Sequence, residues 1–267
     1  MVLGDVLIII SRNGGAFVSR WAHVVVGITW IGLLYFFNFV NGPFQGTQDG
    51  ETKKKVNPEL LPRALYWFRW GAAWTWITGV VLLQLVFWGG HITVDPMRGW
   101  NALAIAMLAF VFVSPFVYDA LAKAIKDPKV FGTVSFVLIG IAICLMHYSG
   151  YTYRAYNIHA AAIFGTIMAW NVWFRIWPAQ QKIIRAVKEG NAPDAGLVKL
   201  AGLRSRHNTY MSVPLLYTMV AQHTTFFAGG NWGIDERTWW IVFLAIIGLG
   251  WHVVFQLYKR SGKVEGF

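Results

Sequence analysis

Long apolar runs separated by short polar segments dominate the chain. A helix needs about 20 apolar residues to cross the hydrocarbon core of a bilayer. Seven runs meet this length and are predicted to be transmembrane helices, at roughly 17–40, 64–88, 100–122, 131–149, 155–177, 209–228 and 238–258. The pattern therefore predicts an all-α integral membrane protein, a bundle of about seven transmembrane helices.

The polar stretch between the fifth and sixth runs is the longest in the chain. We expect Pro178 to end the fifth helix, because proline restricts the backbone before it. Segment 178–208 then indicates an amphipathic helix, a Gly-Asn-Ala-Pro turn and a second short helix. We interpret 178–208 as a cytoplasmic amphipathic connector. It is either a simple interfacial link or a docking surface or substrate gate.

Composition agrees with a membrane location. The 267 residues are 56% hydrophobic and 13% charged, whereas soluble domains have about 25% charged residues. Since no polar segment is long enough for a second domain, residues 1–267 are predicted to form a single polytopic membrane domain. The N-terminal "MVLGDVLIII" lacks a basic region and a cleavage site, so we do not expect a cleaved signal. The lone cysteine, Cys144, excludes an internal disulfide, and the Cys-x-x-Cys-His haem motif does not occur.

Basic residues are distributed unequally between the two sets of loops. Five fall on one side, namely Arg12, Arg20, Arg98, Arg154 and Arg237. The other side has seventeen, in 41–63, 123–130, 175–208 and the C-terminal tail. The positive-inside rule places this richer side in the cytoplasm, with the N-terminus outside and the C-terminus cytoplasmic. The net charge of +11 is thus a topology signal, and we expect no nucleic acid partner.

Histidines within the predicted spans are the main candidates for chemistry. His23, His159 and His223 are expected in one layer near the outer side, with His147 close to them, whereas His207 and His252 lie toward the inner side. Ionisable groups inside a membrane are costly and usually functional. These rings either hydrogen-bond to neighbouring helices or hold a metal or haem. Since the outer layer has no carboxylate, haem b with axial histidines fits better than non-haem iron, and the pairing of the ligands stays open.

Two charged residues lie inside predicted spans near the cytoplasmic side, Arg69 and Asp119. They could pair with each other and satisfy both charges. Alternatively, Arg69 could bind a haem propionate or an anionic substrate. The tryptophans around Arg69 are typical of membrane interfaces, or they could stack against a planar cofactor or purine. Small residues such as Gly71 indicate close helix approach.

Several segments resemble the membrane domain of the bacterial membrane-bound urate oxidases, which carry a C-terminal cytochrome c. The matching segments, in order, are "RWAHVVVGITWIG", "FRWGAAWTWITG", "VYDAL", "HAAAIFGTIMAWNVWFRIWPAQQKII", "RSRHNTYMSVPLLYTMVAQH" and "WHVVFQ". The resemblance aligns five histidines with those of the family. These are His23, His159, His207, His223 and His252. With Arg69 they are the candidate cofactor-binding residues, and His23, His159, His223 and His252 are the candidate metal ligands.

The chain also departs from this family. Gly71 stands where a glutamate is expected, and we expect no cytochrome c domain before the chain stops at Phe267. The resemblance implies a urate oxidase-like redox protein of the bacterial inner membrane, with haem b. Electrons would pass to a separate cytochrome c or quinone, and an anionic purine would bind Arg69, Arg204, Arg206 and Asn208.

Two alternatives stay open, and two others are less favoured or excluded. The first is an accessory or electron-transfer subunit of a larger respiratory or photosynthetic complex, with other membrane subunits as partners. The second is a scaffold in which the histidines only join helices. A transporter is less favoured, because the spans carry few charges and show no internal repeat. A rhodopsin is excluded, since the span at 238–258 has no lysine for a Schiff base.

Overall fold

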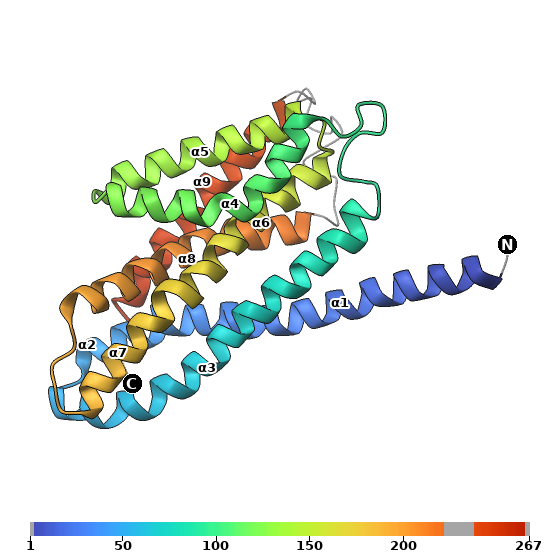
Figure 1. The fold of residues 1–267 in the computed structure, drawn as a ribbon. Helices are drawn as coiled ribbons and strands as arrows, with labels where there is room; N and C mark the ends of the chain where they lie inside the picture. The colour runs from blue at the N-terminus through green and yellow to red at the C-terminus, as the bar shows by residue number, and fades with distance from the viewer. Residues whose placement is uncertain (1–2, 222–237, 265–267) are drawn as a thin grey trace. The chain divides into compact units, whose positions relative to one another are not determined.

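The computed structural model describes residues 3–221 and 238–264, and the regular secondary structure within them is helical. The all-α prediction is therefore confirmed for this part of the chain. Figure 1 shows the elements in order. They are α1 (Leu3–Tyr35), η1 (Phe36–Asn41), α2 (Gly42–Thr47), α3 (Gly50–Leu82), η2 (Leu83–Trp88), α4 (Ala102–Ala124), α5 (Pro128–Tyr148), α6 (Tyr153–Asn171), η3 (Val172–Ile176), α7 (Trp177–Lys188), α8 (Ala195–Ala221) and α9 (Trp239–Ser261), where η marks a π-helical segment.

The internal contacts of the chain define two compact units. Unit 1 comprises residues 1–21, 78–167 and 214–249, and unit 2 comprises residues 22–77, 168–213 and 250–267. Each unit is built from segments that are distant in the sequence.

Five described helical segments are long and apolar enough to cross a membrane. They are Asn13–Thr47, Gly50–Trp88, Ala102–Ala124, Pro128–Tyr148 and Trp239–Ser261. These coincide with the first four predicted spans and the last, so the chain is a multi-pass membrane protein. The predicted span 155–177 is also helical, but it includes the buried polar residues Asn157, His159 and Asn171. The predicted span 209–228 is helical as far as Ala221, and its remainder lies outside the described residues.

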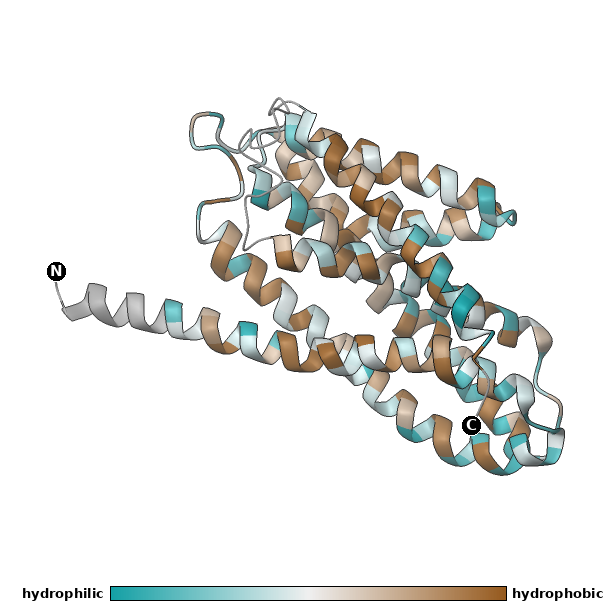
Figure 2. Cartoon of the chain, turned by 180° about the vertical axis from the view of Figure 1, so that it is seen from behind, coloured by the Kyte–Doolittle hydropathy of each residue, from teal (hydrophilic) through white to brown (hydrophobic). Residues whose placement is uncertain are grey.

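Helices α4 and α5 form an apolar hairpin in unit 1. Figure 1 shows them side by side, and Figure 2 shows hydrophobic residues along most of both helices. Each helix begins at a capping side chain, because Asn101 accepts from the Ala104 N–H at 2.9 Å and Asp127 accepts from the Val130 N–H at 2.8 Å. Pro115 inside α4 leaves the carbonyl of Val111 without its usual donor, and the Ser114 hydroxyl donates to that carbonyl at 2.9 Å.

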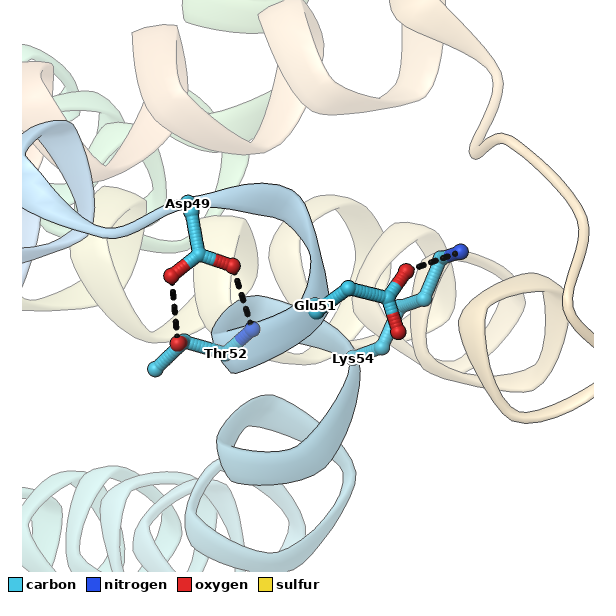
Figure 3. A network of polar contacts seen from close by, with 4 residues as sticks. All are labelled: Asp49, Glu51, Thr52 and Lys54. Atoms are coloured by element: carbon cyan, nitrogen blue, oxygen red, sulfur yellow. Dashed lines mark hydrogen bonds and ion pairs between the residues drawn. The ribbon is translucent and has the colours of Figure 1, made fainter.

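The segment predicted as the loop 41–63 is mostly helical, which corrects the sequence reading. Figure 3 shows how α3 starts: Asp49 accepts from the Thr52 N–H at 2.9 Å and from the Thr52 hydroxyl at 2.7 Å. These bonds lower the pKa of the Asp49 carboxyl, because they stabilise its charged form. Glu51, in the first turn of α3, forms an ion pair with Lys54 at 3.0 Å. This cap lets α3 begin 14 residues before the predicted span at 64–88.

Pro178 does not end the fifth helix, contrary to the sequence prediction. The chain is helical from Tyr153 to Lys188, with η3 before the proline. In η3 the Trp177 N–H donates to the Val172 carbonyl, five residues back. The carbonyl of Phe174, which a non-proline residue at 178 would have bonded, accepts from the Arg175 guanidinium at 3.0 Å. The π-helical segment therefore allows the proline to sit in the first turn of α7.

The connector 178–208 contains the predicted turn, but its second helix is not a separate short one. Helix α7 ends in a Schellman motif, in which the Asn191 N–H donates to the Ala186 carbonyl at 2.8 Å and the Gly190 N–H donates to the Val187 carbonyl at 3.1 Å. Gly190 has φ of +79°. Asp194 then accepts from the Leu197 N–H at 3.0 Å, and α8 continues without a break to Ala221. The expected short helix and the expected sixth span are one helix.

Candidate functional site

His159 on α6 lies in an aromatic cluster in unit 1. Its side chain is completely buried. The imidazole lies 5.0 Å from the Tyr151 ring, 6.0 Å from the Phe87 ring and 6.2 Å from the Trp88 ring, measured between centroids. Phe87 and Trp88 end the π-helical segment η2. The aromatic side chains come from η2 and from the segment before α6, and they surround the ring with apolar surface.

Two hydrogen bonds determine the tautomer of His159. The Trp88 indole N–H can only donate, and it lies 3.0 Å from Nε2 of His159. Nε2 must therefore carry the lone pair, and Nδ1 carries the proton and donates to the Ala155 carbonyl at 2.8 Å. Buried histidines that bind metals typically have this arrangement, with one nitrogen donating to a carbonyl and the other holding a lone pair.

The surroundings of His159 are aromatic, and its Nε2 is occupied by a hydrogen bond. Its Nε2 lone pair points toward a single donor, the Trp88 indole, and the adjoining surface is aromatic. The described residues include no group of three or more His, Cys, Asp or Glu side chains that could hold a metal ion. Haem needs only imidazole ligands and an apolar slot. Ligation by His159 requires the Trp88 indole to move off Nε2.

His23 lies at a close contact between α1 and α3 in unit 2. It hydrogen-bonds to the backbone of Thr75. On the next turn of the same contact, a Cβ at Gly71 would lie 3.2 Å from the backbone nitrogen of Trp30. The predicted role of Gly71 in close helix approach is thus confirmed. A glutamate, which the resemblance places at this position in the family, does not fit this spacing of the helices.

The remaining predicted histidines have different surroundings. His252 on α9 is exposed, and its Nε2 lies 3.1 Å from the Gln256 amide nitrogen. His207 on α8 is half-buried, and its pKa is lowered to about 4 because burial and the charges of Arg204 and Arg206 oppose its protonation. His223 lies outside the described residues. His147 packs against Tyr156 with the ring centroids 5.8 Å apart, and His91 lies in the connection 89–101.

Arg69 lies against aromatic rings of unit 2. Its guanidinium carbon is 4.0 Å from the centre of the Trp177 ring, 5.7 Å from that of Tyr66 and 5.9 Å from that of Trp173. These rings come from α3, η3 and α7. The ion pair recorded for Asp119 in unit 1 is with Lys123 on the same helix, at 2.9 Å. The side chain of Asp119 is thus neutralised from its own helix.

The other residues predicted to bind an anionic purine, Arg204, Arg206 and Asn208, lie on α8 and have different contacts. Asn208 accepts from the Asn171 amide at 2.8 Å and donates to the Met168 carbonyl at 3.0 Å, so it joins α8 to the end of α6. Arg204 is buried on α8, and the Arg206 guanidinium lies 5.1 Å from the Tyr258 ring centre. Asn208 therefore has a structural role.

The sequence analysis missed a polar seam in unit 2, which we define as Asn38, Ser205 and Tyr258. The Asn38 amide nitrogen Nδ2 donates to the Ser205 hydroxyl at 2.8 Å, and the Tyr258 hydroxyl donates to the side-chain oxygen Oδ1 of Asn38 at 2.8 Å. Asn38 lies in η1, so this seam links η1, α8 and α9. An asparagine in the apolar run "FFNFV" was the available signal, because amides in membrane helices often join helices. Trp88, the donor to His159, was also missed, since nothing in its local sequence separates it from interfacial tryptophans.

Comparison with known proteins identifies one family. No curated protein and no solved structure matches the chain. The family model described as "Urate oxidase N-terminal" matches residues 49–265, which is most of the chain and includes Arg69, His159 and His207. His23 precedes the matched region. The chain therefore belongs to the urate oxidase N-terminal family.

Proposed function

We propose that the chain is a urate oxidase-like redox protein of the bacterial inner membrane that binds haem b. Family membership supports the urate oxidase-like character. The observation that carries the cofactor proposal is the tautomer of His159, since Nδ1 donates to Ala155 and Nε2 holds the lone pair. Haem b, when bound, supplies one-electron redox chemistry.

The chain's own residues have separable roles in this proposal. His159 would hold the haem iron through Nε2 once the Trp88 indole leaves that atom, and the bond from Nδ1–H to the Ala155 carbonyl keeps the ring in its orientation. The aromatic rings of Phe87 and Tyr151 keep water away from the imidazole. The other predicted metal ligands, His23, His223 and His252, stay predictions. Electrons removed from urate pass to a separate acceptor, a cytochrome c or a quinone.

The first experiment is a reduced-minus-oxidised visible spectrum of the purified full chain, with a pyridine haemochrome assay. We expect a b-type signal that is lost in His159→Ala and retained in His91→Ala, a matched control in the connection 89–101. Trp88→Phe is expected to retain the signal, because it removes the competing donor and keeps an aromatic ring. A wild-type chain without the signal, or a His159→Ala variant with the full signal, contradicts haem ligation by His159.

A second measurement tests the reaction. The purified chain, with cytochrome c or a quinone added, is expected to consume urate and reduce the acceptor in proportion. Haem content without urate consumption favours the alternative, an accessory or electron-transfer subunit of a larger respiratory or photosynthetic complex. In that case other membrane subunits should remain bound during purification in mild detergent.

A further inference from the structure

The flat face of the Arg69 guanidinium packs against an aromatic ring, whereas its Nε–H group has no acceptor among the described residues. Its guanidinium lies over the Trp177 ring, with Tyr66 and Trp173 nearby. Trp173 is itself held in place, because its indole N–H donates to the Arg69 carbonyl at 3.0 Å. Cation–π contacts of this kind stabilise the positive charge through the ring faces. They leave the N–H groups, which lie in the guanidinium plane, available for acceptors.

Among the described side chains, those of residues 13–221 and 238–264, nothing accepts from the side chain of Arg69. Nε is enclosed by protein and has no hydrogen-bond partner, and none of these carboxylates lies within ion-pair distance of the guanidinium. The other arginine on α3, Arg63, pairs with Glu59 at 2.7 Å. Arginine carries five N–H donors, and an unpaired charge in an apolar span is costly. Such a group is retained where a ligand supplies the missing acceptors.

We propose that Arg69 binds a planar organic anion through its terminal N–H groups. Nη1 and Nη2 carry four of the five N–H donors of the guanidinium. Two parallel N–H bonds from these atoms hold an anion with two neighbouring acceptors in the plane of the guanidinium. The rings of Tyr66, Trp173 and Trp177 offer apolar faces to a flat ligand, which a spherical anion such as phosphate would not use.

The ligand class follows from this combination of charge and shape. A planar anion with adjacent oxygen or nitrogen acceptors fits, and the urate anion is one such molecule. Its identity as urate rests on the proposed function, whereas the site itself rests on the geometry of Arg69. Binding at this site does not depend on haem or on an electron acceptor.

The test is equilibrium binding of radiolabelled urate to the full chain in lipid nanodiscs, without an electron acceptor. We expect Arg69→Gln to weaken binding by roughly 10- to 100-fold, because a hydrogen bond to a charged group contributes about 1.5–3 kcal/mol. Arg69→Lys keeps the charge but loses the paired, planar N–H donors of the guanidinium, so this variant should also bind urate weakly. Arg63→Gln, a change of the same type on the same helix, should bind as the wild type does.

Competition by unlabelled anions tests the ligand class. Benzoate, a planar carboxylate, should displace urate, and inorganic phosphate at the same concentration should not. The folding of each variant is checked by size-exclusion chromatography and by circular dichroism. Trp177→Leu, which removes the ring under the guanidinium, should weaken urate binding even if Arg69→Gln does not fold.

The outcomes separate this inference from the proposed function. Urate binding that depends on Arg69 in a chain that does not oxidise urate supports the site and contradicts the reaction. Urate oxidation with an unchanged KM in Arg69→Gln supports the reaction and overturns the site. Wild-type chain that binds no urate, or urate displaced equally well by phosphate, also overturns the site.

Discussion

Gly71 and Gly32 are both helical glycines, but they differ in the space around a Cβ atom. At Gly71 a Cβ would lie 3.2 Å from the Trp30 backbone nitrogen, whereas at Gly32 no neighbouring atom lies within 4 Å. We expect Gly71→Ala to destabilise the protein by about 1–3 kcal/mol, because the two helices must separate. Gly32→Ala should stabilise it by up to about 1 kcal/mol through helix propensity.

Thermal unfolding in detergent measures both changes against the wild type. Retention of wild-type stability by Gly71→Ala would show that the contact between α1 and α3 is looser than described. Gly71→Glu is expected to be more disruptive than Gly71→Ala.

His207 predicts a pH dependence of stability. Its pKa is about 4 in the folded chain against an ordinary value of 6.5, so between these values the unfolded chain binds the proton and the folded chain does not. The free energy of unfolding should thus fall as the pH falls from about 6.5 to 4. His207→Gln removes this contribution. The wild type should lose more thermal stability than the variant between pH 7.5 and pH 5, and equal losses would contradict the assignment.

At the scale of elements, the join between α7 and α8 depends on one backbone conformation. Gly190 has φ of +79° in the Schellman motif that ends α7. A Cβ is disfavoured in this region by about 1–2 kcal/mol, so Gly190→Ala should lower stability by that amount. Gly202 in α8 has no neighbouring atom within 4 Å of a Cβ. Gly202→Ala is the control and should be neutral or stabilising, and a reversed order in thermal unfolding would refute this account of the turn.

The π-helical segments are the elements that place the polar contacts described here. Asn38 of η1 bonds to Ser205, Trp88 of η2 bonds to His159, and Trp173 of η3 bonds to the Arg69 carbonyl. A π turn adds a residue relative to an α turn and rotates the side chains that follow it. Each segment thereby directs one polar side chain at another helix. Such segments often occur at functional sites.

At the scale of the whole molecule, the unequal basic charge predicts the orientation in the membrane. We expect Met97, which is 92% exposed in the connection 89–101, to face outside, and Lys182 to face the cytoplasm. In a Cys144→Ser background, Met97→Cys should react with an impermeant maleimide in intact spheroplasts. Lys182→Cys should react only after the membrane is opened. The reverse pattern would invert the predicted topology.

The helical membrane class was predictable from the sequence alone, because the apolar runs are as long as a bilayer requires and this length does not depend on partners. The resemblance carried by segments such as "FRWGAAWTWITG" was also readable, and the family match to residues 49–265 confirms it. The residues at which helices begin were harder to predict from the sequence. Asp49 and Asp194 are caps that begin helices inside segments read as polar links.

The tertiary structure alone decided which side chains face one another. Three contacts join residues that are more than 70 positions apart in the sequence. They are the bond from Trp88 to His159, the bond from Tyr258 to Asn38 and the contact of the Trp177 ring with Arg69. Trp88 and Asn38 also lie in π-helical segments, which change the direction of their side chains. One sequence does not specify how helices rotate about their axes, since lipid accepts any apolar face. Apolar length is a local property of the chain, whereas the partner of a buried polar group depends on how the helices pack.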